Sequence, residues 1–223
     1  MKISNLTLEV LKNFANINQN IVVKAGAPIK TIAQAKNVLA EFAAPEDFPV
    51  DFGVYDLNEF LAAVNLIDDA ELEFTSQNVV IKNANSSIKY TFSEPSILTS
   101  APAKPLEMPS SDVVVTITEE DLAQVRRVAS VFGHTDLAVV GDKSGAKLTV
   151  LDTSNATANT FETALTDVKS DLDSYSFVVN IPNLKLIPGD YEVTFSKSLI
   201  SLWEHSTYPV NYHVAINATS EAE

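Results

Sequence analysis

The first half of the chain carries two hydrophobic periods that meet with almost no loop between them. Residues 48–54 alternate apolar and polar positions, which is the period of a half-buried strand. Residues 56–66 then place apolar side chains three and four positions apart, which predicts one buried face of a helix. Asp56 stands at the N-cap position of this helix, and Glu59 follows three residues later as in a capping box. A second amphipathic helix is predicted at 6–17, and further strands are predicted at 21–25, 29–35, 37–43, 71–75, 78–83 and 86–92.

The second half repeats this order of elements. A strand at 113–117 leads into a helix at 118–132, which Thr118 caps and Gly133 stops. Shifting the first helix by 114 positions places Lys12 on Arg126. Strands are predicted at 137–141, 147–151, 160–168, 175–180, 190–196, 199–205 and 208–217, and a short helix at 181–187. The repeated order predicts an α+β fold made of two similar domains, each with a sheet and two helices on one side.

Residues 93–111 interrupt both patterns. This stretch contains four prolines and five serines, a composition typical of an extended connector. We therefore predict a first domain at 1–94, a connector at 95–111 and a second domain at 112–223.

The total charge excludes a conventional nucleic-acid-binding surface. Acids outnumber bases 29 to 15 among 223 residues, and the formal net charge is −14. A strongly acidic protein is repelled by DNA unless its few bases are gathered in one place. Cysteine is absent, which excludes disulfides and thiolate chemistry. No apolar run is long enough to span a membrane and no signal peptide is evident, so we expect a cytoplasmic protein.

No pattern of side chains indicates catalysis or a metal. The three histidines lack a second ligand at metal-binding spacing. Residues 141–145 resemble a phosphate loop only faintly and are better explained as a hairpin turn between two strands. The acids Asp68, Asp69 and Glu71 are explained by a solvated loop. We therefore expect no enzyme activity, no catalytic residue, no metal and no cofactor.

One-third of the fifteen bases fall on or beside predicted helices. These are Lys2, Lys12, Arg126, Arg127 and Lys185. Two interpretations remain open at this point. The bases are either ordinary members of solvated helix faces or a dispersed strip that contacts a phosphate backbone without reading sequence.

Three stretches together resemble a known family. They are MKISNLTLEVLKNFANIN at the start, FPVDFGVYDLNEFLAAVNLIDDAELEF in the middle of the first half, and FVVNIPNLKLIPGDYEV late in the chain. In length, order and spacing they resemble the sliding clamp of T-even-type bacteriophages, the DNA polymerase processivity factor. The resemblance is weak at 93–112, at 150–172 and in the last thirty residues, and Glu59 departs from the small residue expected there.

The resemblance implies a DNA-clamp fold with sheets outside and two helices per domain on the inner face. It implies a homotrimeric ring that encircles double-stranded DNA without sequence preference and tethers the replicative DNA polymerase. An ATP-dependent clamp loader and a sigma-like factor of late transcription are further implied partners, in the cytoplasm of the infected bacterial host. The small, neutral outer face of the 56–66 helix suits such a ring, since a moving duplex should not be gripped. The alternative is a structural phage or surface protein built from two β-rich repeats, with no role on DNA.

The resemblance also assigns roles to particular residues. The five bases named above would face DNA. Head-to-tail closure would join the strand at 86–92 to the strand at 160–168, with Ile88, Tyr90 and Phe92 meeting Phe161 and Leu165. The alternative is that these side chains only fill the core of their own domain. Partner tails would dock near Pro95, Ile97 and Leu98.

Overall fold

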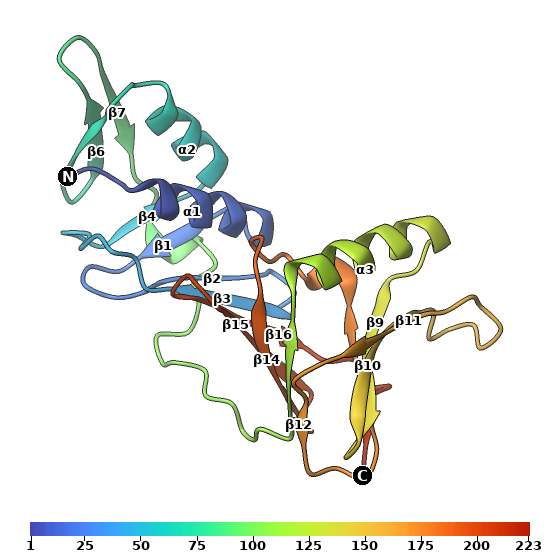
Figure 1. The fold of residues 1–223 in the computed structure, drawn as a ribbon. Helices are drawn as coiled ribbons and strands as arrows, with labels where there is room; N and C mark the ends of the chain where they lie inside the picture. Colours follow the sequence, from blue (N-terminus) through green and yellow to red (C-terminus); the bar gives the residue numbers. More distant parts are fainter. The chain divides into compact units, whose positions relative to one another are not determined.

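The computed structural model describes residues 1–223, which divide into two compact units, Met1–Lys104 and Pro105–Glu223. The division falls inside the segment proposed as the connector. Figure 1 shows helices and antiparallel sheets in both units, and the chain is an α+β protein with three α-helices. The first unit contains α1 (Asn5–Ile17), β1 (Ile21–Val23), β2 (Ile29–Ile32), β3 (Val38–Phe42), β4 (Phe52–Val54), α2 (Leu57–Asn65), β5 (Glu71–Phe74), β6 (Asn78–Lys82), β7 (Ser87–Thr91) and the 3-10 turn η1 (Pro95–Ile97).

The second unit is richer in strands. It contains β8 (Val113–Ile117), α3 (Glu119–Phe132), β9 (Asp136–Asp142), β10 (Gly145–Leu151), β11 (Phe161–Leu165), β12 (Lys169–Ser170), β13 (Tyr175–Asn180), the 3-10 turn η2 (Ile181–Asn183), β14 (Tyr191–Ser196), β15 (Ile200–His205), β16 (Val210–Ala215) and β17 (Glu221–Ala222). Five of its strands pair in the order β12–β8–β14–β15–β16, and the other five in the order β11–β10–β9–β13–β17. Phe177 of β13 stacks on Phe195 of β14 with ring centres 5.4 Å apart, which packs the two sheets against one another.

A side chain caps the N-terminus of each helix in the first unit. Ser4 Oγ accepts a hydrogen bond from the Thr7 backbone N–H at 3.2 Å at the start of α1. At α2, Asp56 Oδ1 accepts the backbone N–H groups of Asn58 and Glu59 at 3.0 and 3.1 Å, which confirms the predicted N-cap. The buried face of α2 consists of the four predicted apolar residues Leu57, Phe60, Leu61 and Val64. Periodicity and capping therefore suffice to place this helix.

Within the first unit the strands form small antiparallel groups. β1 pairs with β4, β2 with β3, and β5, β6 and β7 form a three-stranded meander. The ring of Phe52 on β4 stacks on the ring of Phe92 at 4.9 Å and lies 5.3 Å from that of Phe74. This cluster of phenyl rings fastens the end of the meander to β4.

The second unit departs from the prediction at its second helix. Only η2, a single 3-10 turn, forms where the sequence predicts a helix at 181–187. Pro182 suits the first turn, but Leu184 already leaves helical geometry and Pro188 closes the segment. A stretch this short cannot repay the cost of nucleating a helix. The expectation of two helices in each domain is therefore wrong for the second unit, while the predicted α+β class is confirmed.

Candidate functional site

The predicted bases of the first unit stand apart from one another. Lys2 precedes α1, and its Nζ lies 2.5 Å from Asp69 Oδ1 in an exposed ion pair. The hydrogen bond that Lys2 donates to Asp69 raises the pKa of Lys2. Lys12 is exposed on α1, between the exposed residues Glu9 and Asn16. This helix face therefore carries isolated charges of both signs.

The structure gathers the predicted bases of the second unit more closely. Arg126 on α3 donates from Nη2 to the carbonyl oxygen of Leu184 at 3.2 Å. This bond brings the middle of α3 to the segment that contains Lys185, which is exposed. Arg127, the next residue of α3, is also exposed. Of the five predicted bases, the structure therefore brings Arg126 and Arg127 to the segment that contains Lys185.

The outer face of α2 lacks long charged side chains apart from Glu59. Asn58, Ala62 and Asn65 are exposed, as predicted from the helical pattern. Leu66, just after the helix, is 76% exposed. A surface of small and neutral side chains makes few strong hydrogen bonds to phosphate, so contacts there would be weak and insensitive to sequence.

Each unit exposes one unpaired strand edge among the strands predicted for assembly. β7 pairs only with β6, and β11 pairs only with β10, so each has one row of backbone groups free. An unpaired edge is a template for a strand of another chain. The predicted contact strands are therefore both available at their backbones.

The side chains of these edge strands are divided between their own cores and the surface. The ring of Tyr90 lies 5.3 Å from that of Phe60, and its hydroxyl donates to the Asp56 carbonyl at 3.4 Å. Burial, with the nearby acids Glu59 and Asp56, raises the pKa of Tyr90 to about 12. Ile88, Phe92 and Phe161 are half-buried, and Leu165 is 8% exposed. Assembly through these residues remains a prediction, because each side chain also packs inside its own unit.

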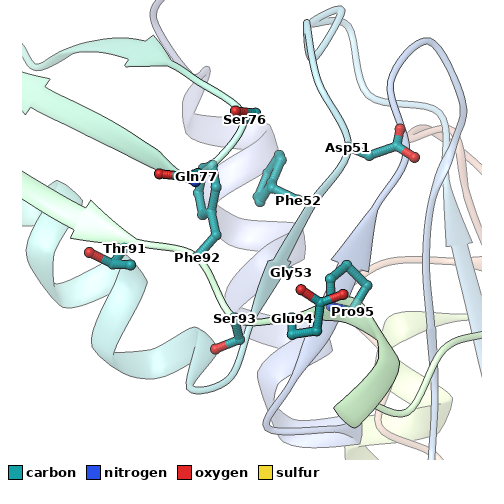
Figure 2. A pocket seen from close by; sticks show the side chains of 10 residues that line it. All are labelled: Asp51, Phe52, Gly53, Ser76, Gln77, Thr91, Phe92, Ser93, Glu94 and Pro95. Carbon is teal, nitrogen blue, oxygen red and sulfur yellow. The ribbon is translucent and has the colours of Figure 1, made fainter.

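A pocket of about 280 Å³ lies where β7 runs into η1 (Figure 2). The rings of Phe52 and Phe92 lie side by side in its wall, with Gln77 near them. Gly53 on β4 lets the backbone of Ser93 lie close to this strand. A Cβ at residue 53 would meet the Ser93 carbonyl oxygen at 2.7 Å. The residues lining this pocket are Asp51, Phe52, Gly53, Ser76, Gln77, Thr91, Phe92, Ser93, Glu94 and Pro95.

The residues predicted to bind partner tails differ in exposure. Pro95 borders the pocket of Figure 2, and Ile97 is 70% exposed, whereas Leu98 is only 8% exposed. Leu98 packs over Gly53, where a Cβ would meet its Cδ1 at 2.7 Å. Leu98 thus anchors the chain after β7, and Ile97 is the member of this set that a partner could reach.

A second, smaller pocket was missed by the sequence reasoning. It has a volume of about 180 Å³ and is lined by Val22, Lys24, Ala27, Pro28, Lys30 and residues 100–103. Small and proline residues form its apolar part, and two lysines border it. The Ala-Pro pairs at 27–28 and 101–102 were the available signal, since such pairs leave backbone uncovered by long side chains.

The other candidate chemistry has structural explanations. Residues 141–145 form the predicted hairpin turn, in which Asp142 Oδ1 accepts the Ser144 backbone N–H at 2.7 Å. His134 and His205 bond to the backbone carbonyls of Asn159 and Pro188 at 2.7 and 3.0 Å. No group of three or more potential ligands is placed to hold a metal ion. None of the three helices has the length and apolar character that crossing a bilayer requires.

Comparison with known proteins identifies relatives along the whole chain. Residues 2–98 match the family model described as DNA polymerase processivity factor. The sliding clamp of Enterobacteria phage T4 is 33% identical over an alignment of 231 positions, which covers 99% of this chain and 98% of that protein. The sliding clamp of Vibrio phage KVP40 is 31% identical and covers 90% of this chain and 93% of its own. The similarity extends well beyond the three stretches that indicated it.

Solved structures with much lower sequence identity share the fold. The PCNA2–PCNA3 complex of Sulfolobus tokodaii aligns with a TM-score of 0.67 at 12% identity, over 95% of both chains. Proliferating cellular nuclear antigen of Entamoeba histolytica aligns with a TM-score of 0.64 at 13% identity, over 95% of both chains. The chain therefore has the PCNA-like clamp fold.

Proposed function

The chain belongs to the phage sliding clamp family, the non-enzymatic DNA polymerase processivity factors, and from this we propose that it closes head-to-tail into a homotrimeric ring around duplex DNA. The observation that carries the proposal is the pair of free edges, β7 in one unit and β11 in the other. Two different edges on one chain make a heterologous contact, and such contacts close into rings when the rotation per subunit permits. Membership of this family argues against the alternative of a structural phage or surface protein.

In the proposed ring, retention on DNA is mechanical. A trimer would carry a formal charge of about −42, three times that of one chain, and this charge discourages stray contacts with DNA. Lys2, Lys12, Arg126, Arg127 and Lys185 would line the hole and offset the repulsion there. Contacts of this kind are dispersed and salt-sensitive, so they leave the ring free to slide.

The replicative polymerase would be held through a short apolar tail. We assign the docking surface to the pocket between the Ala27–Pro28 turn and residues 100–103, together with the exposed side chain of Ile97. The two lysines at its border, Lys24 and Lys30, already pair with Asp51 and Glu41. An apolar tail with few charges of its own therefore fits this pocket best.

The remaining parts of the proposal follow the family resemblance. An ATP-dependent clamp loader would open the ring at one β7–β11 contact and place it on DNA. The loaded ring would also support late transcription through a sigma-like factor. These events would take place in the cytoplasm of the infected bacterial host.

The test compares retention on circular and linear duplexes. Light scattering near micromolar concentration should give about three subunits per particle. Loaded rings should stay on a nicked circle, and they should leave within seconds of its linearisation by running off the ends. A blocked linear duplex, with a bulky protein at each end, is the matched control and should retain the ring. Equal retention on open linear and circular DNA would contradict enclosure.

A further inference from the structure

The segment that follows η2 is extended, and its side chains alternate between core and surface. Leu184 and Leu186 are buried, whereas Lys185 between them is exposed. Successive side chains of an extended chain point to opposite sides. The two leucines therefore face the core of the second unit, and Lys185 faces outward.

The backbone of this segment lacks the regular hydrogen bonds that a helix would provide. A buried peptide group without a partner is costly, so its N–H and C=O groups must bond elsewhere. Side chains of α3, β14, β15 and β16 supply four such bonds to residues 184–188. The four side chains are those of Arg126, Tyr191, His205 and Tyr212.

Two tyrosines hold both backbone groups of Ile187. The hydroxyl of Tyr191 on β14 donates to the Ile187 carbonyl at 2.6 Å, and the Ile187 N–H donates to the hydroxyl of Tyr212 on β16 at 3.4 Å. Both tyrosines are fully buried, and burial raises the pKa of each. The Tyr191 hydroxyl therefore keeps the proton that it donates, and the peptide groups on both sides of Ile187 are fixed.

His205 at the end of β15 holds the next carbonyl. Its Nδ1 accepts the backbone N–H groups of Thr207 and Tyr208 at 3.0 and 3.1 Å, so this nitrogen carries no proton. The ring proton is therefore on Nε2, which donates to the Pro188 carbonyl at 3.0 Å. Gly189 permits this approach, because a Cβ at residue 189 would overlap the imidazole.

Arg126 holds the other end of the segment. Its Nη2 donates to the Leu184 carbonyl at 3.2 Å, which lies directly before Lys185. Lys185 is thus placed between a bonded carbonyl on one side and the doubly bonded Ile187 on the other. A side chain on a fixed backbone loses less freedom when it meets its partner.

We propose that these four side chains form a backbone clamp that keeps Lys185 directed towards DNA inside the ring. Tyr191, His205 and Tyr212 are its positioning residues, because they act on DNA through the backbone of Lys185. The clamp matters for DNA only in the proposed ring, on which the inference rests. It does in the second unit what the helical hydrogen bonds of α2 do in the first, which is to fix the backbone of a surface segment.

A double-mutant cycle tests whether the tyrosines act through Lys185. K185Q should shorten retention on closed circles by a few-fold at low salt, since it removes one charge from the lining. The same substitution should have a much smaller effect in Y191F or Y212F, because the lysine is no longer held there. A general loss of stability would leave the ratio between the K185 and Q185 proteins unchanged, so this ratio separates positioning from a merely structural role.

Y175F is the matched control for removal of a tyrosine hydroxyl. Tyr175 is also buried in the second unit, but its hydroxyl has no hydrogen-bond partner. K185Q should therefore shorten retention in Y175F as much as in the wild type.

Amide hydrogen exchange measures the clamp itself. Y212F removes the acceptor of the Ile187 N–H, so exchange of this amide should quicken by about three- to tenfold. Y175F should leave the exchange rate of Ile187 unchanged. Unchanged exchange in Y212F would show that the hydroxyl does not hold the segment and would overturn the clamp.

The other outcomes separate the clamp from the ring. An equal K185Q effect in the wild type, Y191F and Y212F would overturn the positioning role. Rings that stay on circles but are insensitive to K185Q would place Lys185 outside the lining, which overturns the inference and leaves the ring intact. A wild-type protein that remains monomeric at high concentration would overturn the proposed ring and the inference with it. If Y191F does not fold, Y212F alone carries the cycle, because its bond is the longer of the two.

Discussion

The two units build the layer beside their sheets from different elements. In the first unit α2 supplies four buried apolar residues in a regular helix. In the second unit η2 is a single turn. The buried apolar side chains of this segment come from the extended residues after it, Leu184, Leu186 and Ile187. The second unit has two groups of five paired strands, whereas the groups within the first unit have two or three. A unit with larger sheets can therefore cover its core with a shorter segment.

The largest difference between the units should appear when the matching apolar anchors are truncated. Phe60 on α2 is 2% exposed and contacts Tyr90, and we expect F60A to lower the free energy of unfolding by about 3–5 kcal/mol. Leu184, which follows η2, is 5% exposed, and L184A should cost about 2–3 kcal/mol, because an irregular segment can relax into the space. Denaturant unfolding followed by circular dichroism and by fluorescence of Trp203, the only tryptophan, measures both.

One outcome would count against this comparison, and one variant controls it. Trp203 belongs to the second unit, so F60A should shift the dichroism transition more than the fluorescence transition if the units unfold separately. A coincident shift would mean that the units unfold as one. L66A, at a 76% exposed site, is the matched control and should change stability by less than about 0.5 kcal/mol.

The contrast between α2 and η2 also shows which secondary-structure elements the sequence alone can predict. The hydrophobic period, the N-cap and the stop signal predict the bounds of α2 and α3 to within one residue. Each of these signals lies within the helix or beside it in the sequence. The apolar run at 181–187 has a helix-like spacing, yet proline near each end leaves too few residues for a stable helix. The short strands β12 and β17 were not predicted, since two residues carry no period and pair only because the fold brings a neighbour to them.

In the candidate site, too, some features can be predicted from the sequence and others depend on tertiary contacts. Exposure of Lys12, Arg126 and Arg127 follows from helical position, so sequence could predict it. The bond from Arg126 to the Leu184 carbonyl joins residues 58 positions apart, and no local pattern encodes it. The pocket at residues 100–103 is likewise formed by two distant turns. Such contacts depend on tertiary packing, which a single sequence does not display.

A smaller effect should distinguish how α1 and α3 are capped. At α1, Glu46 accepts the Ser4 backbone N–H at 2.5 Å and the Thr7 hydroxyl at 2.6 Å, from about forty residues away. At α3, the capping group is local, because Thr118 and Asp121 bond to one another. We expect E46Q to cost about 0.5–2 kcal/mol at neutral pH, since it removes charge-assisted bonds to a helix start.

The pH dependence of this cost follows from the pKa of Glu46. Burial opposes its charge, but hydrogen bonds from Thr7 and Ser4 outweigh burial and hold the pKa below the ordinary 4.5. A lowered carboxyl pKa contributes stability that is complete above the ordinary value and is lost as pH falls through the folded-state value. The gap in unfolding free energy between wild type and E46Q should therefore be constant above about pH 5 and shrink in acid. A gap that persists undiminished in acid would show that Glu46 acts through packing.

The smallest expected effect compares the bases of the two units. Arg126 is held by its bond to Leu184 and has Arg127 beside it, whereas Lys12 stands alone on α1. We expect R126E to shorten retention on closed circles more than K12E, each by a few-fold at low salt, because a fixed guanidinium loses less freedom on meeting a phosphate. The difference should fade as salt rises, since every lost phosphate contact lowers the salt slope by about 0.9. K197E reverses the same charge outside the proposed lining and controls for net charge. If K197E shortened retention as much as R126E, total charge rather than position would govern sliding, and the contrast between the units would have no bearing on DNA.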